Sequence, residues 1–357
     1  MCPWPLGAWP SSCTVGTPGE RARAADTVNR WSLGTALVMA LALSIVVGVR
    51  FGSVPLTTGE VMAVLTGGGD AVSRDIVLTF RLPRVLLGIL VGGGLAIAGA
   101  TFQALLRNPL AEPYILGISG GASVGAVLVL AFGWAAAGSW ALPLAAFAGA
   151  ILAIVMVFGV ATATGRAMDV RVLLLAGVVV AAFFSAVITL ILSVSPARTV
   201  QSAVMWIMGS LAGANWRNVG LTAAYTLPAS ILLLSFARSL NLMAIGEETA
   251  AYLGADVERV KRGALLVAAL ITASGVAVAG VIGFVGLVVP HAVRLLIGSD
   301  HRVLLPLSFL AGGAFLTLAD LFARMALAPI EMPIGVITAF VGVPFFLLLL
   351  RRSLTSR

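Results

Sequence analysis

The segment at residues 85–106 constrains the fold most, because it contains no ionisable side chain and is preceded by paired arginines, Arg81 and Arg84. An α-helix rises about 1.5 Å per residue, so a helix over this segment crosses the roughly 30 Å hydrocarbon core of a bilayer. Glycines at positions 92, 93, 94 and 99 remove side-chain bulk, which lets neighbouring helices approach closely in lipid. The segment therefore predicts a bundle of packed transmembrane helices.

The composition of the whole chain is that of an integral membrane protein. Of 357 residues, 60% are hydrophobic and 10% are charged, and the mean hydropathy is +1.09. Soluble domains carry roughly 25% charged residues. The net charge of +8 would suit a nucleic-acid binder, but the basic residues are scattered between apolar runs without interleaved aromatic residues. We expect no nucleic-acid partner and interpret the basic residues as topology signals.

Ten apolar runs predict an all-α polytopic membrane protein with ten crossings. They cover residues 33–49, 85–106, 114–137, 140–165, 172–192, 219–236, 263–283, 284–297, 303–319 and 332–350. The stretch 263–297 has no polar loop, but one helix over its 35 residues would far exceed the roughly 20 residues that span a bilayer. We therefore divide this stretch into two helices.

The basic residues also predict the orientation. With the amino terminus inside, fifteen of the 22 arginines and lysines lie in inner segments and seven in outer segments, as the positive-inside rule favours. Both termini are then cytoplasmic in a multi-pass protein of the cytoplasmic (inner) membrane. We expect residues 1–30, with four prolines, to form a disordered cytoplasmic tail, residues 31–352 to form the transmembrane domain and residues 353–357 to form a second cytoplasmic tail. The outer segments 51–84 and 193–217 are expected along the membrane surface.

Several kinds of chemistry are absent from the sequence. Lys261 is the only lysine and lies outside any phosphate-binding loop, so the chain has no ATPase site of its own. Its two histidines, His291 and His301, are accompanied by no metal-binding motif. Only Asp320 is an acidic residue near an apolar run, which disfavours an ion-coupled carrier. We predict no catalytic residue, no cofactor and no bound metal.

Residues 238–262 form the only long cytoplasmic connection, and they predict two short helices. Glu247 and Glu248 follow Gly246, where a helix dipole favours negative charge, and Gly254 suits the end of that helix. Asp256 is placed to cap a second helix that ends in basic residues 259–262. Such a pair of helices either transmits a force from a partner or only connects two spans.

Several separated motifs resemble those of one known family. They are RLPR at 81–84, AGATFQALLRNPLAEPYILGISGGASVGA at 98–126, GEETAAYLG at 246–254, GFVGLVVPHAVRLLIGSDHRVLLP at 283–306 and EMPIGVITAFVGVPFF at 331–346. In this order, over residues 31–352, the chain is similar to the permease subunit of binding-protein-dependent ABC importers for vitamin B12, ferric siderophores and haem. The first thirty residues lie outside the resemblance.

The resemblance implies a vitamin-B12-importer-like permease fold of ten helices. It also implies a second permease copy, identical or related, with the translocation path at the interface, and two cytoplasmic ABC ATPase subunits that supply the energy. The loop at 238–262 becomes the coupling loop, and the residues implied to contact the ATPase are Gly246, Glu247, Glu248, Leu253 and Gly254.

On the outer side, the resemblance implies docking of a periplasmic or lipid-anchored substrate-binding protein whose glutamates meet Arg81, Arg84 and Arg324. Two structural interpretations compete with docking. Arg81 and Arg84 would snorkel to the membrane interface, and Arg324 would pair with Asp320 four residues earlier on its helix. The inner gate of this family corresponds to residues 166–171, which here lack the usual small hydroxyl residues, so no gate residue is assigned.

The leading hypothesis is thus the transmembrane permease subunit of an ATP-driven importer that translocates an iron chelate across the cytoplasmic membrane. A ferric siderophore is the first expectation for the cargo because such systems are numerous, and vitamin B12 and haem are the alternatives. The second hypothesis is a stand-alone secondary transporter or exporter. A purely structural or signalling membrane subunit ranks last.

Overall fold

The computed structural model describes residues 29–135, 140–163, 169–254 and 256–355. Seven long helices are apolar enough to cross a membrane: α2 (Arg30–Arg50), α5 (Leu82–Leu105), α7 (Ala141–Ala163), α8 (Val170–Ser193), α10 (Trp216–Ser235), α13 (Val257–Ala279) and α15 (His301–Met325). Two shorter apolar helices are α6 (Ile118–Ala131) and α14 (Val285–Ile297), and α16 (Ile334–Thr355) is apolar over Ile334–Leu349. Together they account for the ten predicted apolar runs, and the described residues contain no strand. The expected tail lies almost wholly outside the described residues.

Helix α5 is the centre of the bundle. The helix that contains it runs without interruption from Ala71 to Leu105, and 89% of its most apolar stretch is buried inside the protein. A side chain at Gly92 would collide with the backbone of Gly312 in α15, and one at Gly99 would collide with Gly286 in α14. The predicted role of the glycines in close helix packing is confirmed.

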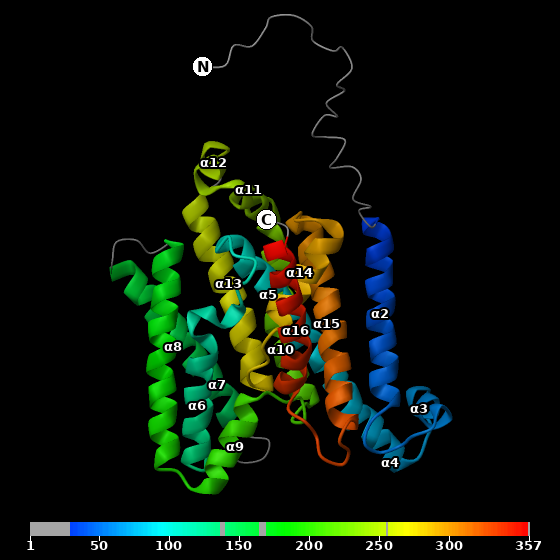
Figure 1. Cartoon of the computed structure of the whole chain (residues 1–357). Helices are drawn as coiled ribbons and strands as arrows, with labels where there is room; N and C mark the ends of the chain where they lie inside the picture. Colours follow the sequence, from blue (N-terminus) through cyan, green and yellow to red (C-terminus); the bar gives the residue numbers. More distant parts are fainter. Residues whose placement is uncertain (1–28, 136–139, 164–168, 255, 356–357) are drawn as a thin grey trace, which may run out of the picture.

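The remaining elements lie at the two ends of the bundle (Figure 1). Helices α11 (Ala237–Ile245) and α12 (Glu247–Tyr252) lie at the same end as the start of α2 and the end of α16. Helices α3 (Thr58–Leu65), α4 (Ala71–Arg74) and α9 (Ala197–Ile207) lie at the opposite end. The two segments predicted to share one membrane surface do share one end.

The expectation for residues 51–84 needs one correction. Only the first part of this segment, with α3, is separate from the spanning helices. From Ala71 the chain is continuously helical through a π-helical stretch at Asp75–Arg81 into α5. Because residues 71–84 include polar side chains, the sequence predicted that the span begins at residue 85. The helix begins fourteen residues earlier, at Ala71.

The predicted division of 263–297 is confirmed, since α13 ends at Ala279 and α14 begins at Val285. Gly280 and Phe284 both have positive φ, at 70° and 67°. The Tyr114 hydroxyl donates to the Ile282 carbonyl at 3.0 Å, and a Glu112 carboxylate oxygen accepts from the Phe284 N–H at 2.7 Å. These side chains satisfy backbone groups that a break in lipid would otherwise leave unpaired, which explains why no polar loop is needed.

Candidate functional site

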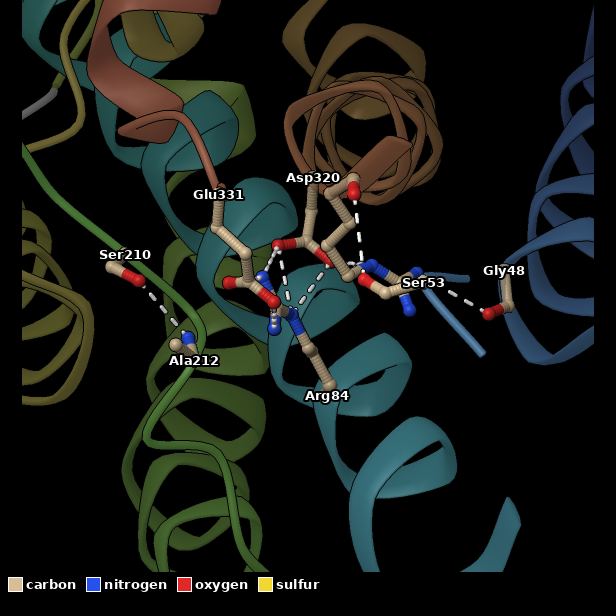
Figure 2. A network of polar contacts seen from close by, with 8 residues as sticks. Gly48, Ser53, Arg84, Ser210, Ala212, Asp320 and Glu331 are labelled. Atoms are coloured by element: carbon tan, nitrogen blue, oxygen red, sulfur yellow. Dashed lines mark hydrogen bonds and ion pairs between the residues drawn. The ribbon is translucent and has the colours of Figure 1, made fainter. Parts of the chain in front are cut away.

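The structure brings Arg81, Arg84 and Arg324 together at the end of the bundle that carries α3 and α4. With Asp320 and Glu331 they form what we call the arginine cluster. Arg84, near the start of α5, lies between two carboxylates (Figure 2). Its Nη2 donates to Asp320 Oδ1 and to Glu331 Oε2, each at 2.9 Å, and its Nε donates to Asp320 at 3.0 Å. Charge-assisted, multidentate bonds of this kind fix both position and orientation.

Arg324 and Asp320 lie one turn apart on α15. The Arg324 Nε lies 3.1 Å from Asp320 Oδ2, and both side chains are at most 5% exposed. Arg324 Nη2 also donates to the Gly48 carbonyl near the end of α2 at 3.3 Å. The structural interpretation, in which Arg324 pairs with Asp320, is confirmed, although Arg324 also fastens α15 to α2.

Arg81 caps the end of α2. Its Nη1 donates to the carbonyls of Val49 and Arg50 at 2.9 and 2.8 Å, and its Nη2 donates to Val54. The carbonyls of Val49 and Arg50 belong to the last turn of α2 and have no partner inside the helix, and a cation there meets the negative end of the helix dipole. Arg81 is only 4% exposed, so it does not snorkel towards an interface. The most exposed side chain of the cluster is Glu331, at 35%.

The opposite end carries the second candidate site, which we call the helical pair: α11, Gly246, α12 and the turn to Gly254. Gly246 has a φ of 154° and Gly254 a φ of +86°, so a glycine stands at each end of α12. Asp256 accepts from the Arg259 N–H at 3.1 Å and caps the next helix, as predicted. That helix is α13, which continues to Ala279. The prediction of a separate short helix ending at 259–262 was wrong, because the apolar run follows directly.

The surface of the helical pair is apolar and exposed. Ile245, Tyr252 and Leu253 are 71%, 91% and 62% exposed, and Glu248 is exposed beside them. Glu247 instead points inwards, with Oε2 at 2.5 Å from Lys261 Nζ. Sequence reasoning missed Ile245 and Tyr252. Large apolar residues on either side of a short acidic helix, in a loop outside the membrane runs, are the signal that would have indicated them.

The region predicted to hold an inner gate is only partly described. Asp169 caps α8 by accepting from the Arg171 N–H at 2.8 Å, and Met168 lies outside the described residues. An apolar pocket of about 590 Å³ lies between the end of α9, the break before α14 and α16. Its lining contains no ionisable side chain and includes Met208, Phe284 and Phe340. Within the described residues, no group of three or more potential metal ligands lies together.

Comparisons with known proteins identify the architecture. The sequence profile of the FecCD transport family matches residues 40–352. The cobalamin import system permease protein BtuC of Halobacterium salinarum is 46% identical, over 83% of this chain and 79% of that protein. The hemin transport system permease protein HmuU of Yersinia pestis is 42% identical, over 78% and 84%.

A solved structure supports the same assignment. A transporter described as a metal-chelate type ABC transporter in an inward-facing conformation matches with a TM-score of 0.81 and 30% identity, over 91% of this chain and 100% of that chain. None of these similar proteins supports the alternative of an exporter. The chain belongs to the FecCD transport family, and it is a multi-pass membrane permease subunit of an ABC importer, not itself an enzyme.

Proposed function

We propose that two permease subunits, identical or related, form the translocation path of a metal-chelate importer, and that two separate ATPase subunits drive it through the helical pair. One observation carries this proposal: a short helix with a strongly exposed apolar surface projects from one end of a chain that has no phosphate-binding loop. In an ABC importer the energy comes from ATP hydrolysis, so this proposal assigns ATP hydrolysis to another protein, to which the helical pair offers a surface.

The exposed side chains of the helical pair support contact with the ATPase. Tyr252 and Leu253 are large, exposed apolar residues that precede α13, which begins at Val257, and in this proposal they lie outside the lipid. Exposed apolar groups that gather in this way mark protein interfaces. Glu248 adds a negative charge to the same surface. Of the five residues implied by the resemblance, we propose that Glu248 and Leu253, which are exposed, contact the ATPase, and that Gly246 and Gly254 set the backbone angles around them.

The proposal fixes the orientation in the membrane. The helical pair faces the cytoplasm, where ATP is available, so the start of α2 and the end of α16 are cytoplasmic and the arginine cluster lies on the outer side. The excess of basic residues in the inner segments supports this orientation.

The binding protein docks, in this proposal, over the arginine cluster. Arg81 and Arg324 are each 4% exposed and already bonded to main-chain carbonyls, so they hold α2 against α5 and α15 beneath the docking surface. The side chain of Arg84 is 11% exposed and lies beside Glu331, which is 35% exposed. Arg84 is therefore the arginine that a partner carboxylate would meet, and Arg81 and Arg324 would support its position.

The cargo in this proposal is a large metal chelate: a ferric siderophore, a cobalamin or haem. The names of the similar permeases, for cobalamin and for hemin, support the class of compound. A chelate can move along a path only if no site on the path binds it tightly. The apolar pocket beside Phe284 and Phe340 has no ionisable side chain in its lining, which supports such a weakly binding path.

The proposal is tested by co-expression of this chain with a candidate ATPase subunit and a candidate binding protein from the same organism. In the double variant Tyr252→Asp with Leu253→Asp, charge replaces the exposed apolar surface, so we expect loss of ATPase co-purification and of uptake at unchanged membrane abundance. The matched control is Met62→Asp with Leu65→Asp in α3, at 55% and 52% exposure on the opposite end, which should keep the ATPase bound. Undiminished uptake by the first variant, or gradient-driven accumulation by this chain alone, would refute the proposal.

A further inference from the structure

Three charged residues from three parts of the chain meet beside the helical pair, and we call them the ion triad: Arg107, Glu247 and Lys261. Glu247 is the first residue of α12. Its Oε2 lies 2.5 Å from the Lys261 Nζ in α13, and its Oε1 lies 3.7 Å from the Arg107 Nη2, just after α5. One carboxylate thus faces cations from both neighbouring helices.

The burial of Lys261 separates this contact from ordinary surface ion pairs. Its side chain is 5% exposed, and Glu247 is 32% exposed. On the same first turns of α13, the pair Glu258–Arg262 is 64% and 56% exposed. Exposed pairs contribute little, whereas a buried ammonium group that loses its carboxylate is strongly unfavourable. The Lys261–Glu247 pair therefore resists separation far more than its neighbour does.

The backbone at Arg107 is fixed by hydrogen bonds to the last turn of the central helix α5. Its φ is 47°, in the left-handed region, and its N–H donates to the Ala104 carbonyl at 3.2 Å. The next N–H, of Asn108, donates to the Gln103 carbonyl at 3.1 Å. These bonds close the last turn of α5 in the manner of a left-handed cap. A force on Arg107 is thus applied to the buried helix around which the bundle packs.

A displacement of α12 is transmitted only weakly through the backbone on either side of it, because a glycine lies at each end of this helix. Gly246 and Gly254 flank the helix with conformations that favour glycine, and Ala250 is its only buried residue. Because the helix has six residues and one small buried side chain, its packing against the bundle is slight. The Glu247 carboxylate is the strongest described link between α12 and the spanning helices.

We propose that Glu247 is a transmission residue rather than an ATPase contact: chiefly through the buried Lys261, and more weakly through Arg107, which is 52% exposed, it makes α13 and α5 follow when α12 is displaced. This inference rests on the proposed role of the helical pair in coupling. It assigns Glu247 a different task from Glu248, although the two are adjacent acidic residues, because Glu247 faces the bundle and Glu248 faces solvent.

The sequence provides a reporter for the Lys261–Glu247 contact, since Lys261 is the only lysine. An amine-acylating reagent such as an N-hydroxysuccinimide ester therefore has one side-chain target in the chain, and peptide mass spectrometry separates it from the amino terminus. Burial and pairing protect this amine. Loss of the carboxylate partner should expose it to the reagent.

The test uses the complex of this chain with its ATPase and binding protein in proteoliposomes. In Glu247→Gln we expect ATPase binding and ATP hydrolysis to persist, while cargo imported per ATP falls at least about tenfold and Lys261 acylation rises by a similar factor. The control Glu258→Gln, which breaks the exposed pair with Arg262, should change neither quantity. The exchange Glu247→Lys with Lys261→Glu should restore part of the coupling.

The outcomes separate this inference from the proposed function. An unchanged ratio of cargo to ATP in Glu247→Gln would overturn the inference and leave the proposed function standing. Loss of ATPase binding in that variant would also overturn it, because Glu247 would then be a contact residue. Failure of the wild-type chain to bind the ATPase would refute the proposed function itself. Lys261 acylation can be measured in Glu247→Gln and in Glu258→Gln even where the variant transports nothing.

Discussion

The two ends of the bundle use charge in opposite ways. In the arginine cluster, Arg84, Asp320 and Arg324 are at most 11% exposed and bond to one another or to main-chain carbonyls. In the helical pair, Glu248 is exposed beside apolar side chains such as Tyr252, at 91% exposure. The first region joins α2, α5 and α15, whereas α12 in the second region projects from the bundle between two glycines.

This contrast indicates different consequences of substitution. Changes in the arginine cluster should act mainly on the stability of the fold, because they leave buried charges without partners. Changes in the helical pair should act mainly on transport, because its surface is exposed in the permease alone. Each prediction below can break or sharpen this distinction.

The largest effect is expected for Asp320→Ala. Asp320 is 2% exposed and accepts from Arg84 while it pairs with Arg324, so its loss leaves two buried arginines short of a carboxylate. We expect destabilisation of about 3–5 kcal/mol, measured as thermal unfolding of the purified permease in detergent. The control Glu258→Ala removes a carboxylate from an exposed pair with Arg262 and should shift unfolding far less. Equal shifts would mean that the cluster is not a structural junction.

A smaller effect, on transport instead of stability, is expected for Gly246→Ala. With φ at 154° and ψ at 147°, Gly246 occupies a region that is essentially restricted to glycine. An alanine there adds roughly 1–3 kcal/mol of strain, which re-angling of α12 would relieve. We expect reduced uptake per ATP with nearly unchanged thermal unfolding. A large loss of stability would show that the helical pair is as firmly integrated as the arginine cluster.

Glu331→Gln should change stability by about 1 kcal/mol or less, because Glu331 is partly exposed and Arg84 keeps its bonds to Asp320. If a partner carboxylate meets Arg84, removal of the competing charge should strengthen docking. The measurement is the affinity of the purified binding protein for the permease in nanodiscs. Weaker docking would mean that Glu331, and not Arg84, contacts the partner.

The positions of the helices were predictable from sequence because lipid imposes a simple rule. A run such as 85–106 can satisfy its backbone in a membrane only as a helix, and the break near Gly280 follows from the length limit of one span. The capping roles of Asp256 and the pairing of Arg324 with Asp320 were also predictable, since the partners are three and four residues apart.

The directions of the charged side chains were not predictable in the same way. Arg84 meets Asp320 across 236 residues of sequence and Glu331 across 247, so its inward orientation depends on how α15 packs against α5. Glu247 and Glu248 have equivalent surroundings in sequence, yet only Glu247 reaches Lys261. The resemblance to the importer family located both regions, and packing decided which groups remain accessible.

The smallest expected effect concerns Asp300, which links the helical pair to α15. Its carboxylate accepts from the Asn241 side chain in α11 at 2.8 Å and from the Arg302 N–H at 3.1 Å. These bonds, chiefly that from Asn241, lower the pKa of Asp300 below its ordinary value of 3.8. A group with a lowered pKa stabilises the fold above the ordinary pKa, and this contribution disappears as the pH falls through the lowered value.

We therefore expect α11 to be held equally well from neutral pH down to about pH 4, and to loosen only in stronger acid. Pepsin, which is active in acid, can measure this loosening as the rate of cleavage within the helical pair. Asp300→Asn is the matched variant, because asparagine still caps α15 but carries no charge. The wild-type chain should be cut a few fold more slowly than Asp300→Asn near pH 4, and the two rates should converge as the carboxylate becomes protonated. Equal rates throughout would show that the charge of Asp300 does not hold the helical pair, and that other contacts of α11, such as the bond from the His301 N–H to Asn241 Oδ1 at 2.8 Å, are sufficient.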